Sequence, residues 1–320
     1  MTRRAALSRL ALTAGLAATA ALTSCSATGT GGDAAKVGDH VISNADFQGL
    51  LDDLTKLSVT AGVLATDTAG APLAPPVLTG DFARGRLAAW VTAEAMSDDL
   101  AARGRFVTDA QRAAVQQELE TSFANDWTIA SPRVREHLVD TNAAIEAFIA
   151  SYTDAAAVQA SYEQGIAASG YACVSHILLA TEDEAKAVLA ELAGGADFAT
   201  VAAQRSTDTG SGQAGGALTD QSSGSPCMAA DAFKGAFVPE FVQGALDATV
   251  GVPTQPIKSD FGYHIILVRP FAEVSAIVLR LAGATAAQAH YADVFAGAHV
   301  TVANRYGRWD PDRLDVVALA

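Results

Sequence analysis

Two short stretches decide the fold of the middle of the chain: VSHIL at residues 174–178 and FGYHII at residues 261–266. Both are apolar and rich in β-branched residues, which indicates strands. Each stretch carries one histidine, His176 in the first and His264 in the second. The sequence therefore predicts two strands that each present one titratable side chain.

The chain between the two strands predicts helices at 182–192, 196–204 and 239–246. A long Gly/Ser-rich loop separates the second helix from the third. Strands and helices mixed at this spacing are typical of a small α+β domain, which we place at residues 171–270.

Four further motifs lie between the two histidines: FATVA at 198–202, STD at 206–208, GGAL at 215–218 and GAFVPEF at 235–241. Together and in this order, the six motifs resemble the parvulin family of peptidyl-prolyl isomerases. The resemblance covers about 100 residues. It implies a four-stranded antiparallel sheet with surrounding helices, and isomerisation of X–Pro bonds without a cofactor.

The resemblance also implies roles for individual residues. His176 and His264 correspond to the paired histidines at the floor of the parvulin site, and Asp208 falls beside them. The apolar wall and the rim of the site correspond to Leu218, Phe237 and Phe241, and to Ser259 and Phe261.

This sequence departs from the family pattern at two places. Phe237 stands where methionine is usual, which would narrow the pocket. The loop 219–234 is longer than usual and contains Cys227. Both departures concern the rate of catalysis more than the identity of the domain.

Rotation about a peptide bond faces a barrier of roughly 18–20 kcal/mol because of amide resonance. The catalyst must bind the twisted amide better than either planar form. The twisted carbonyl has less charge separation, so an apolar wall favours it. We therefore expect the two histidines and Asp208 to orient and polarise the substrate rather than to attack it.

Each of these residues also has a structural interpretation. A strand histidine is often a core or surface residue, Asp208 could cap a turn, and Phe237 and Phe241 could be ordinary core. His176, His264 and Cys227 could ligate a metal, but they lack a second close ligand pair, so we expect no metal site. The remaining histidines are interpreted as surface or packing residues: His40, His137, His290 and His299.

The N-terminus predicts export. Three arginines precede an uncharged run that is too short to span a bilayer, which indicates a signal peptide at residues 1–24. The closing sequence LTSC resembles the lipobox of bacterial lipoproteins, in which Cys25 is lipidated. A plain secretory signal with a chance cysteine is the alternative. We expect a tether at residues 25–35 and an anchor on the extracytoplasmic face of the cell membrane.

The chain is acidic, with a formal net charge of −14 from 21 basic and 35 acidic residues. Removing residues 1–24 removes three arginines and no acid, so the mature charge is −17. Such a surface disfavours nucleic acid as a partner. Export also permits oxidation, and Cys173 and Cys227 could then form a disulfide, which would stabilise the fold by roughly 4 kcal/mol at most.

Helical patterns fill residues 36–170 on one side of the α+β domain, with capped helix starts predicted at Ser43, Thr108 and Ser131 and a last helix at 154–168. A further helix is predicted at about 285–296 in the tail, 271–320. This predicts one mainly helical domain, split in sequence, with the parvulin domain inserted. The arrangement resembles the PrsA/SurA group of extracytoplasmic foldases, and its tail resembles actinobacterial lipoproteins of that type. It implies unfolded exported polypeptides as partners.

Two other functions remain open at this stage: a peptide-binding chaperone or envelope scaffold with little isomerase activity, and a structural lipoprotein that binds no peptide. The sequence also bears on the choice of substrate, because parvulins selective for phosphorylated substrates carry arginines after the first strand. This chain has Glu182, Asp183 and Glu184 there, which would repel a phosphate.

Overall fold

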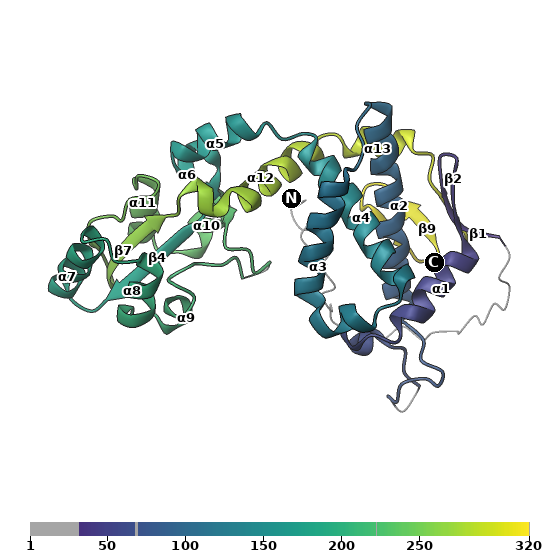
Figure 1. The fold of residues 1–320 in the computed structure, drawn as a ribbon, viewed down its shortest axis with the longest axis horizontal. Helices are drawn as coiled ribbons and strands as arrows, with labels where there is room; N and C mark the ends of the chain where they lie inside the picture. The colour runs from purple at the N-terminus through teal and green to yellow at the C-terminus, as the bar shows by residue number, and fades with distance from the viewer. Residues whose placement is uncertain (1–31, 68–69, 222, 320) are drawn as a thin grey trace. The chain divides into compact units, whose positions relative to one another are not determined.

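The computed structural model describes residues 32–67, 70–221 and 223–319 (Figure 1). The chain divides into two compact units. Residues 153–283 form one unit, here called the central unit, and the chain before and after it forms the other, here called the terminal unit. The predicted signal peptide, Cys25 and most of the predicted tether lie outside the described residues.

The central unit contains an antiparallel sheet in the order β4-β7-β6. Its strands are β4 (Val174–Leu179), β7 (Gly262–Val268) and β6 (Ile257–Ser259). The α+β class is confirmed, but the fourth strand is reduced to one isolated bridge between Ser175 and Ala217. The chain at Ala217 follows Gly215 and Gly216, both with positive φ, and it runs beside β4 only briefly.

Helices cover both faces of this sheet. On one face lie α7 (Glu182–Ala193) and α8 (Phe198–Arg205), whose apolar residues pack with Ile177, Leu179 and Ile265. On the other face lies α11 (Pro239–Leu246), whose Phe241 packs with Val174 and Ile266. The alternation of side chains along the strands produces these two separate clusters.

The remaining elements of the central unit include several that the sequence did not predict. The predicted helix at 154–168 is broken into α5 (Ala155–Glu163) and α6 (Ile166–Ser169), because Gly165 adopts φ +105°. The short strands β3 (Tyr171–Ala172) and β5 (Met228–Ala229) pair with each other, and helix α10 (Ala230–Ala236) follows β5. β5 and the first part of α10 lie inside the predicted loop 219–234. Helix α12 (Phe271–Gln288) begins well before the predicted tail helix.

The terminal unit joins the two ends of the chain. β1 (Asp33–Val37) pairs with β2 (His40–Ser43) on one side and with β8 (Thr301–Val302) on the other. Ala35 lies opposite Val302 in this sheet. Residues 33–35, placed in the predicted tether, are therefore part of a strand.

Four helices of the terminal unit begin after a capping side chain; the sequence predicted the caps Ser43, Thr108 and Ser131 but not Thr79. α1 (Asn44–Leu54), α2 (Gly80–Ala102), α3 (Asp109–Ile129) and α4 (Pro132–Ala150) start after Ser43, Thr79, Thr108 and Ser131, whose side chains accept backbone N–H bonds. The other elements are a 3-10 turn at Ser58–Val63, α13 (Tyr291–Gly297), and a hairpin of β9 (Arg308–Asp310) and β10 (Asp315–Val317) that the sequence did not predict.

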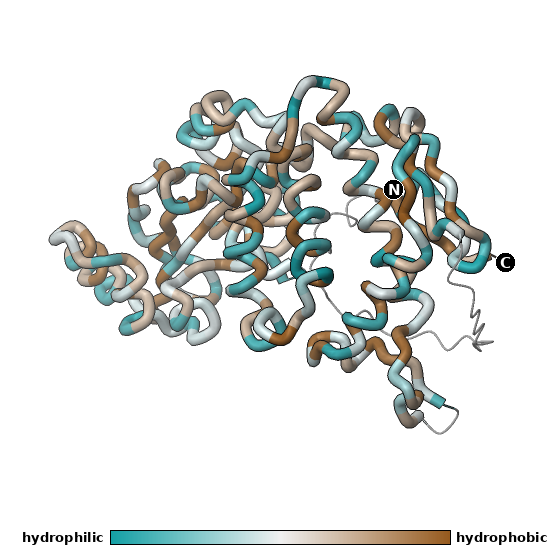
Figure 2. The backbone as a smooth tube through the Cα atoms, turned by 45° about the vertical axis from the view of Figure 1, so that its right-hand side comes forward, coloured by the Kyte–Doolittle hydropathy of each residue, from teal (hydrophilic) through white to brown (hydrophobic). Residues whose placement is uncertain are grey.

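Apolar and polar positions interleave along the helices (Figure 2). Among the described residues, no helix combines the length and the apolar character that crossing a bilayer requires.

Candidate active site

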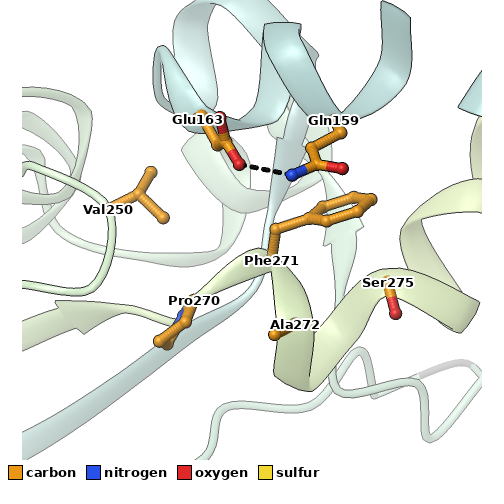
Figure 3. Close-up of a pocket in the computed structure, with 7 residues that line it drawn as sticks. All are labelled: Gln159, Glu163, Val250, Pro270, Phe271, Ala272 and Ser275. Atoms are coloured by element: carbon orange, nitrogen blue, oxygen red, sulfur yellow. Dashed lines mark hydrogen bonds between the residues drawn. The ribbon is translucent and has the colours of Figure 1, made fainter. Parts of the chain in front are cut away.

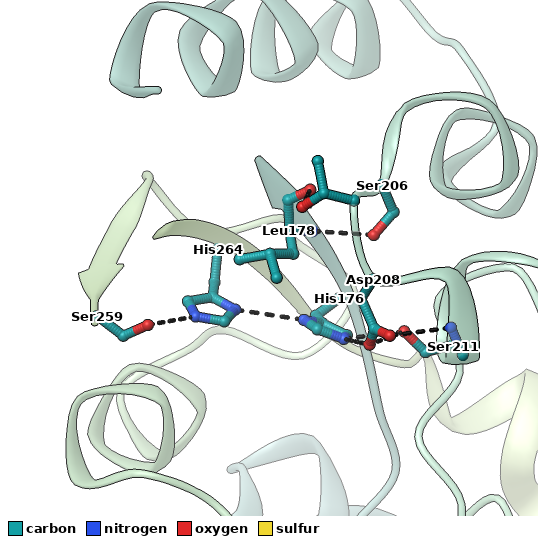
Figure 4. Close-up of polar contacts among 9 residues, drawn as sticks. His176, Leu178, Ser206, Asp208, Ser211, Ser259 and His264 are labelled. Atoms are coloured by element: carbon teal, nitrogen blue, oxygen red, sulfur yellow. Dashed lines mark hydrogen bonds and ion pairs between the residues drawn. The ribbon is translucent and has the colours of Figure 1, made fainter. Parts of the chain in front are cut away.

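His176 and His264 lie on the same face of the sheet. β4 and β7 pair so that His176 is opposite Ile266 and His264 is opposite Leu178. The two histidines are therefore diagonal neighbours on adjacent strands, close enough for their rings to meet. Their Nδ1 atoms are 3.3 Å apart, and the side chains are almost fully buried (Figure 4).

Asp208 approaches the other side of the His176 ring. It caps the short helix α9 (Thr209–Gly212), and its Oδ2 lies 2.9 Å from His176 Nε2. Ser211, one turn later, places its Oγ 2.9 Å from the same Nε2 and 2.6 Å from Asp208 Oδ2. The sequence did not single out Ser211, although its position three residues after a capping aspartate is the signal that could have identified it.

Ser259 closes the network at the opposite end. It lies in β6, and its Oγ is 2.7 Å from His264 Nε2. The same Oγ accepts a bond from the backbone N–H of Phe261 at 3.1 Å. The Phe261 side chain itself is 68% exposed. Ser259 thus belongs to the hydrogen-bond chain, and Phe261 presents its ring to solvent.

These contacts fix the donor and the acceptor in each hydrogen bond of the network that runs from Asp208 to Ser259. A carboxylate only accepts, so His176 Nε2 donates to Asp208. In a neutral ring Nδ1 of His176 is then an acceptor, and His264 Nδ1 donates to it. His264 Nε2 in turn accepts from the Ser259 hydroxyl. The single carboxylate of Asp208 therefore sets the tautomers of both histidines.

The pKa values agree with this order. Burial, followed by the proximity of His176, lowers the pKa of His264 to about 4. Burial also lowers the pKa of His176, against the opposing effect of Asp208. The hydrogen bond from Ser211 is the main cause that lowers the pKa of Asp208 to about 2. At neutral pH both rings are uncharged and the network carries one negative charge, on Asp208.

Gly216 allows a backbone segment to lie directly against the site. Its carbonyl accepts the His176 N–H at 2.9 Å, and its φ is +79°. A Cβ at this position would lie 2.4 Å from the carbonyl oxygen of His176. This close approach explains why glycine occupies the second position of the GGAL motif.

Phe241 forms the apolar surface over the two histidines. Its ring meets His176 edge-on at 5.3 Å and His264 at 5.0 Å between centroids. Phe237 lies 5.4 Å from Phe241, and both contact the buried ring of Phe233 at 5.0 and 6.1 Å. Leu218 packs against the same cluster. Phe233 was not predicted from the sequence because it fell inside the expected loop.

The other predicted residues are placed as follows. Cys173 and Cys227 form the predicted disulfide, with an S–S distance of 2.01 Å, so Cys227 offers no free thiolate to a metal. Within the described residues, no group of three or more His, Cys, Asp or Glu side chains could hold a metal ion.

The remaining histidines are surface or packing residues, as predicted. His40 and His299 are exposed. His137 lies against Trp90 in a tilted arrangement at 4.6 Å, and His290 stacks on Tyr152 at 4.3 Å between centroids.

The central unit also has a hollow that lies apart from the histidine network. Its volume is about 560 Å³, and Figure 3 shows residues of α5 and of the start of α12 around it. The lining residues, which include Glu163, Val250 and Phe271, are not members of the histidine network.

Sequence comparison defines the class of this domain. Residues 176–270 match the family model "Rotamase: PPIC-type PPIASE domain". This segment is thus a parvulin-type peptidyl-prolyl isomerase domain, as the motifs predicted.

Two curated proteins similar to this chain are named foldases. The foldase protein PrsA of Exiguobacterium sibiricum is 44% identical over 95 residues, which cover 29% of this chain and 28% of that protein. The foldase protein PrsA 3 of Bacillus anthracis is 38% identical over 107 residues, covering 32% and 34%. The match thus spans about a third or less of each relative.

Among solved structures, the crystal structure of PrsA from Bacillus subtilis is 21% identical, with a TM-score of 0.29. The alignment covers 75% of this chain and 94% of that one.

Proposed function

We propose that this protein is an extracytoplasmic foldase that isomerises X–Pro bonds of exported, incompletely folded polypeptides. The observation that carries the proposal is the buried network of His176, His264 and Asp208 beneath Phe241, inside a parvulin-type domain. We assign residues 171–270 to catalysis, and residues 36–170 with 271–320 to binding of the unfolded client.

The proposed mechanism is rotation without covalent chemistry. The proline ring rests on the apolar wall of Leu218, Phe237 and Phe241, which favours the less polar, twisted amide over the planar forms. A hundred-thousandfold acceleration requires about 7 kcal/mol of such differential binding. The histidines are neutral and their tautomers are set, so they present oriented dipoles without a charge that would stabilise the planar amide.

We further propose that the protein is anchored at Cys25 on the outer face of the cell membrane. The support is the sequence LTSC after a charged and then apolar leader. Metabolic labelling with an alkyne fatty acid should mark the wild-type protein in its native host type and leave Cys25→Ser unlabelled. Equal labelling of both proteins would contradict the anchor.

The central test is isomerisation of short X–Pro peptides, followed by NMR exchange so that no coupling protease is needed. His176→Ala, Asp208→Ala and His264→Ala should each lower kcat/KM at least about tenfold. His40→Ala, in an exposed histidine of the terminal unit, should match the wild type. Absence of activity in the intact, folded protein would refute the enzyme assignment.

A second candidate function, a peptide-binding chaperone with little isomerase activity, rests on Phe237 and the long 219–234 loop. It predicts peptide binding and suppression of aggregation without rate acceleration. The same wild-type protein assayed for both properties separates the two functions, since only the foldase proposal requires acceleration.

A further inference from the structure

The disulfide joins two segments that both belong to the site. Cys173 directly precedes β4 and lies three residues before His176, and Cys227 directly precedes β5 and α10. Both cysteines are buried, at 0% and 1% exposure. One covalent bond therefore connects the strand that carries the first histidine with the segment that leads into the aromatic wall.

The same bond closes the long loop at its base. The loop leaves the sheet at Leu218, whose N–H donates to the Val174 carbonyl at 2.9 Å. It returns at Cys227, which is bonded to Cys173, the neighbour of Val174. The two ends of the insertion are thus attached to adjacent residues at the start of β4. The extra residues of the loop lie between these two attachment points, so the segment after Cys227 starts from a fixed position.

The backbone attachment of the returning segment is short, although Met228, Ala230 and Phe233 are buried in the core and the Ala230 N–H donates to the Gly170 carbonyl at 2.8 Å. β5 pairs with β3 over two residues, Tyr171 with Ala229 and Ala172 with Met228. Helix α10 follows with seven residues, and among the described residues no side chain caps its start at Ala229. A two-residue ladder and a helix of two turns are marginal by themselves. Their position therefore depends on packing and on the disulfide.

Packing leads from this segment to the histidines. The buried Phe233 of α10 contacts both Phe237 and Phe241, and Phe241 contacts both histidine rings. By contrast, the hydrogen-bond network is held by β4, β6, β7 and α9. The disulfide joins the two sets at β4 and α10, but β4 is also held by its six pairings with β7, whereas α10 is not part of that sheet.

We propose that the Cys173–Cys227 disulfide is a positioning element of the isomerase site, which holds α10 and Phe237 against Phe241 despite the long loop. The inference rests on the proposed function. Opening the bond releases the wall and leaves the network in place, so it weakens the preference for the twisted amide and lowers kcat more than it raises KM. Loss of the Phe237 contact corresponds to a change of about two- to tenfold.

The test compares three proteins: wild type, the double variant Cys173→Ala/Cys227→Ala, and Phe233→Ala. Isomerisation of a Phe–Pro or Ala–Pro peptide gives KM and kcat, and amide hydrogen exchange reports on residues 228–241. We expect the double variant to lower kcat about two- to tenfold with a smaller change in KM. It should lose exchange protection in α10, and Phe233→Ala should reproduce both effects.

Dithiothreitol provides the matched control on unmutated protein. The dithiol transfers two electrons and two protons to the disulfide, giving two cysteine thiols and a cyclic oxidised reagent. Reduction should change the wild type toward the double variant and leave the double variant unaffected. If the double variant does not fold, reduction of folded wild type, checked by circular dichroism, carries the same test.

Wild-type kcat and wild-type exchange protection after the bond is opened would overturn the proposal. This outcome is distinct from failure of the proposed function, in which the oxidised wild-type protein itself does not accelerate isomerisation. In that case, unchanged protection of residues 228–241 on reduction would still overturn the inference.

Discussion

His176 and His264 meet through the same ring atom, Nδ1 to Nδ1, at 3.3 Å. Only one of the two nitrogens can carry the shared proton, so the pair has two possible polarities. Asp208 selects one of them, because it requires the proton on His176 Nε2. Ser259, at the other end, completes that polarity by donating to His264.

Asp208→Asn therefore removes the selection while retaining the size of the side chain. We expect kcat/KM to fall roughly tenfold or more, because an amide can either donate or accept and both polarities become populated. The pKa of His176 should fall further, since Asp208 now raises it. NMR titration of the His176 ring measures this, and Ser211→Ala, which retains the carboxylate, should lower activity less. An unchanged His176 pKa would contradict the assigned direction of the bonds.

Acidification should inactivate the site near pH 4. Protonation of His264, whose pKa is about 4, adds a proton to Nε2, so this nitrogen can no longer accept the hydrogen bond of the Ser259 hydroxyl. The rate should remain level through neutral pH and fall to about half near that pKa. A profile that bends near pH 6.5 would contradict buried, neutral rings.

The same shift predicts how stability depends on pH. In the unfolded chain His264 takes up a proton near its ordinary pKa of 6.5, but in the folded protein only near 4. The unfolded state thus binds more protons in this window, and the free energy of unfolding falls as pH decreases from 6.5 to about 4. Thermal unfolding of wild type and His264→Gln across this window measures it, and the variant should show a shallower dependence.

Gly216→Ala should destabilise the protein by about 2 kcal/mol or more. The added Cβ would meet the His176 carbonyl oxygen, and the position has φ +79°. Gly85→Ala is the matched control, since a Cβ there meets nothing within 4 Å and the residue lies inside α2. The control should be neutral or slightly stabilising. Denaturant unfolding of both variants gives the comparison, and equal stabilities would contradict the close approach of Gly216 to β4.

A phosphorylated substrate should bring no advantage. The first turn of α7 contains three acids, Glu182, Asp183 and Glu184, at its start. Glu182 pairs with Lys186 and Glu184 bonds back to Thr181, which leaves a net negative charge at this position. We expect kcat/KM for a phosphoSer–Pro peptide to be equal to or below that for its Ser–Pro counterpart. A clear preference for the phosphopeptide would contradict this reading of the loop.

The sequence was most informative where a residue type and its spacing had one physical meaning. The alternating strands around His176 and His264, the caps at Ser131 and Thr108, and the cysteine pair all led to correct predictions. The site geometry followed because the register of two paired strands brings both histidines to one face.

The elements and residues that the sequence did not predict also have physical explanations. Helix α10 lies in a stretch rich in Gly, Ala and Ser, where tertiary contacts of Phe233 and not local propensity stabilise the helix. Helix α12 begins at Phe271, well before the predicted helix at about 285–296, and its Val274 and Val278 recur at helical spacing and are fully buried. Ser211 was missed because a serine in a Gly/Ser-rich loop has no signal until Asp208 caps the turn beside it.

The pairing of β1 with β8 has a consequence for the order in which the chain can fold. Ala35, near the start of the described chain, needs Val302, near its end, as its partner in the sheet. The central unit needs only residues 153–283. During synthesis from the N-terminus the central unit is therefore complete while the terminal unit still lacks its last strands. The residues made first therefore cannot complete their sheet until the residues made last are present, whereas the central unit can fold before the terminal unit is complete.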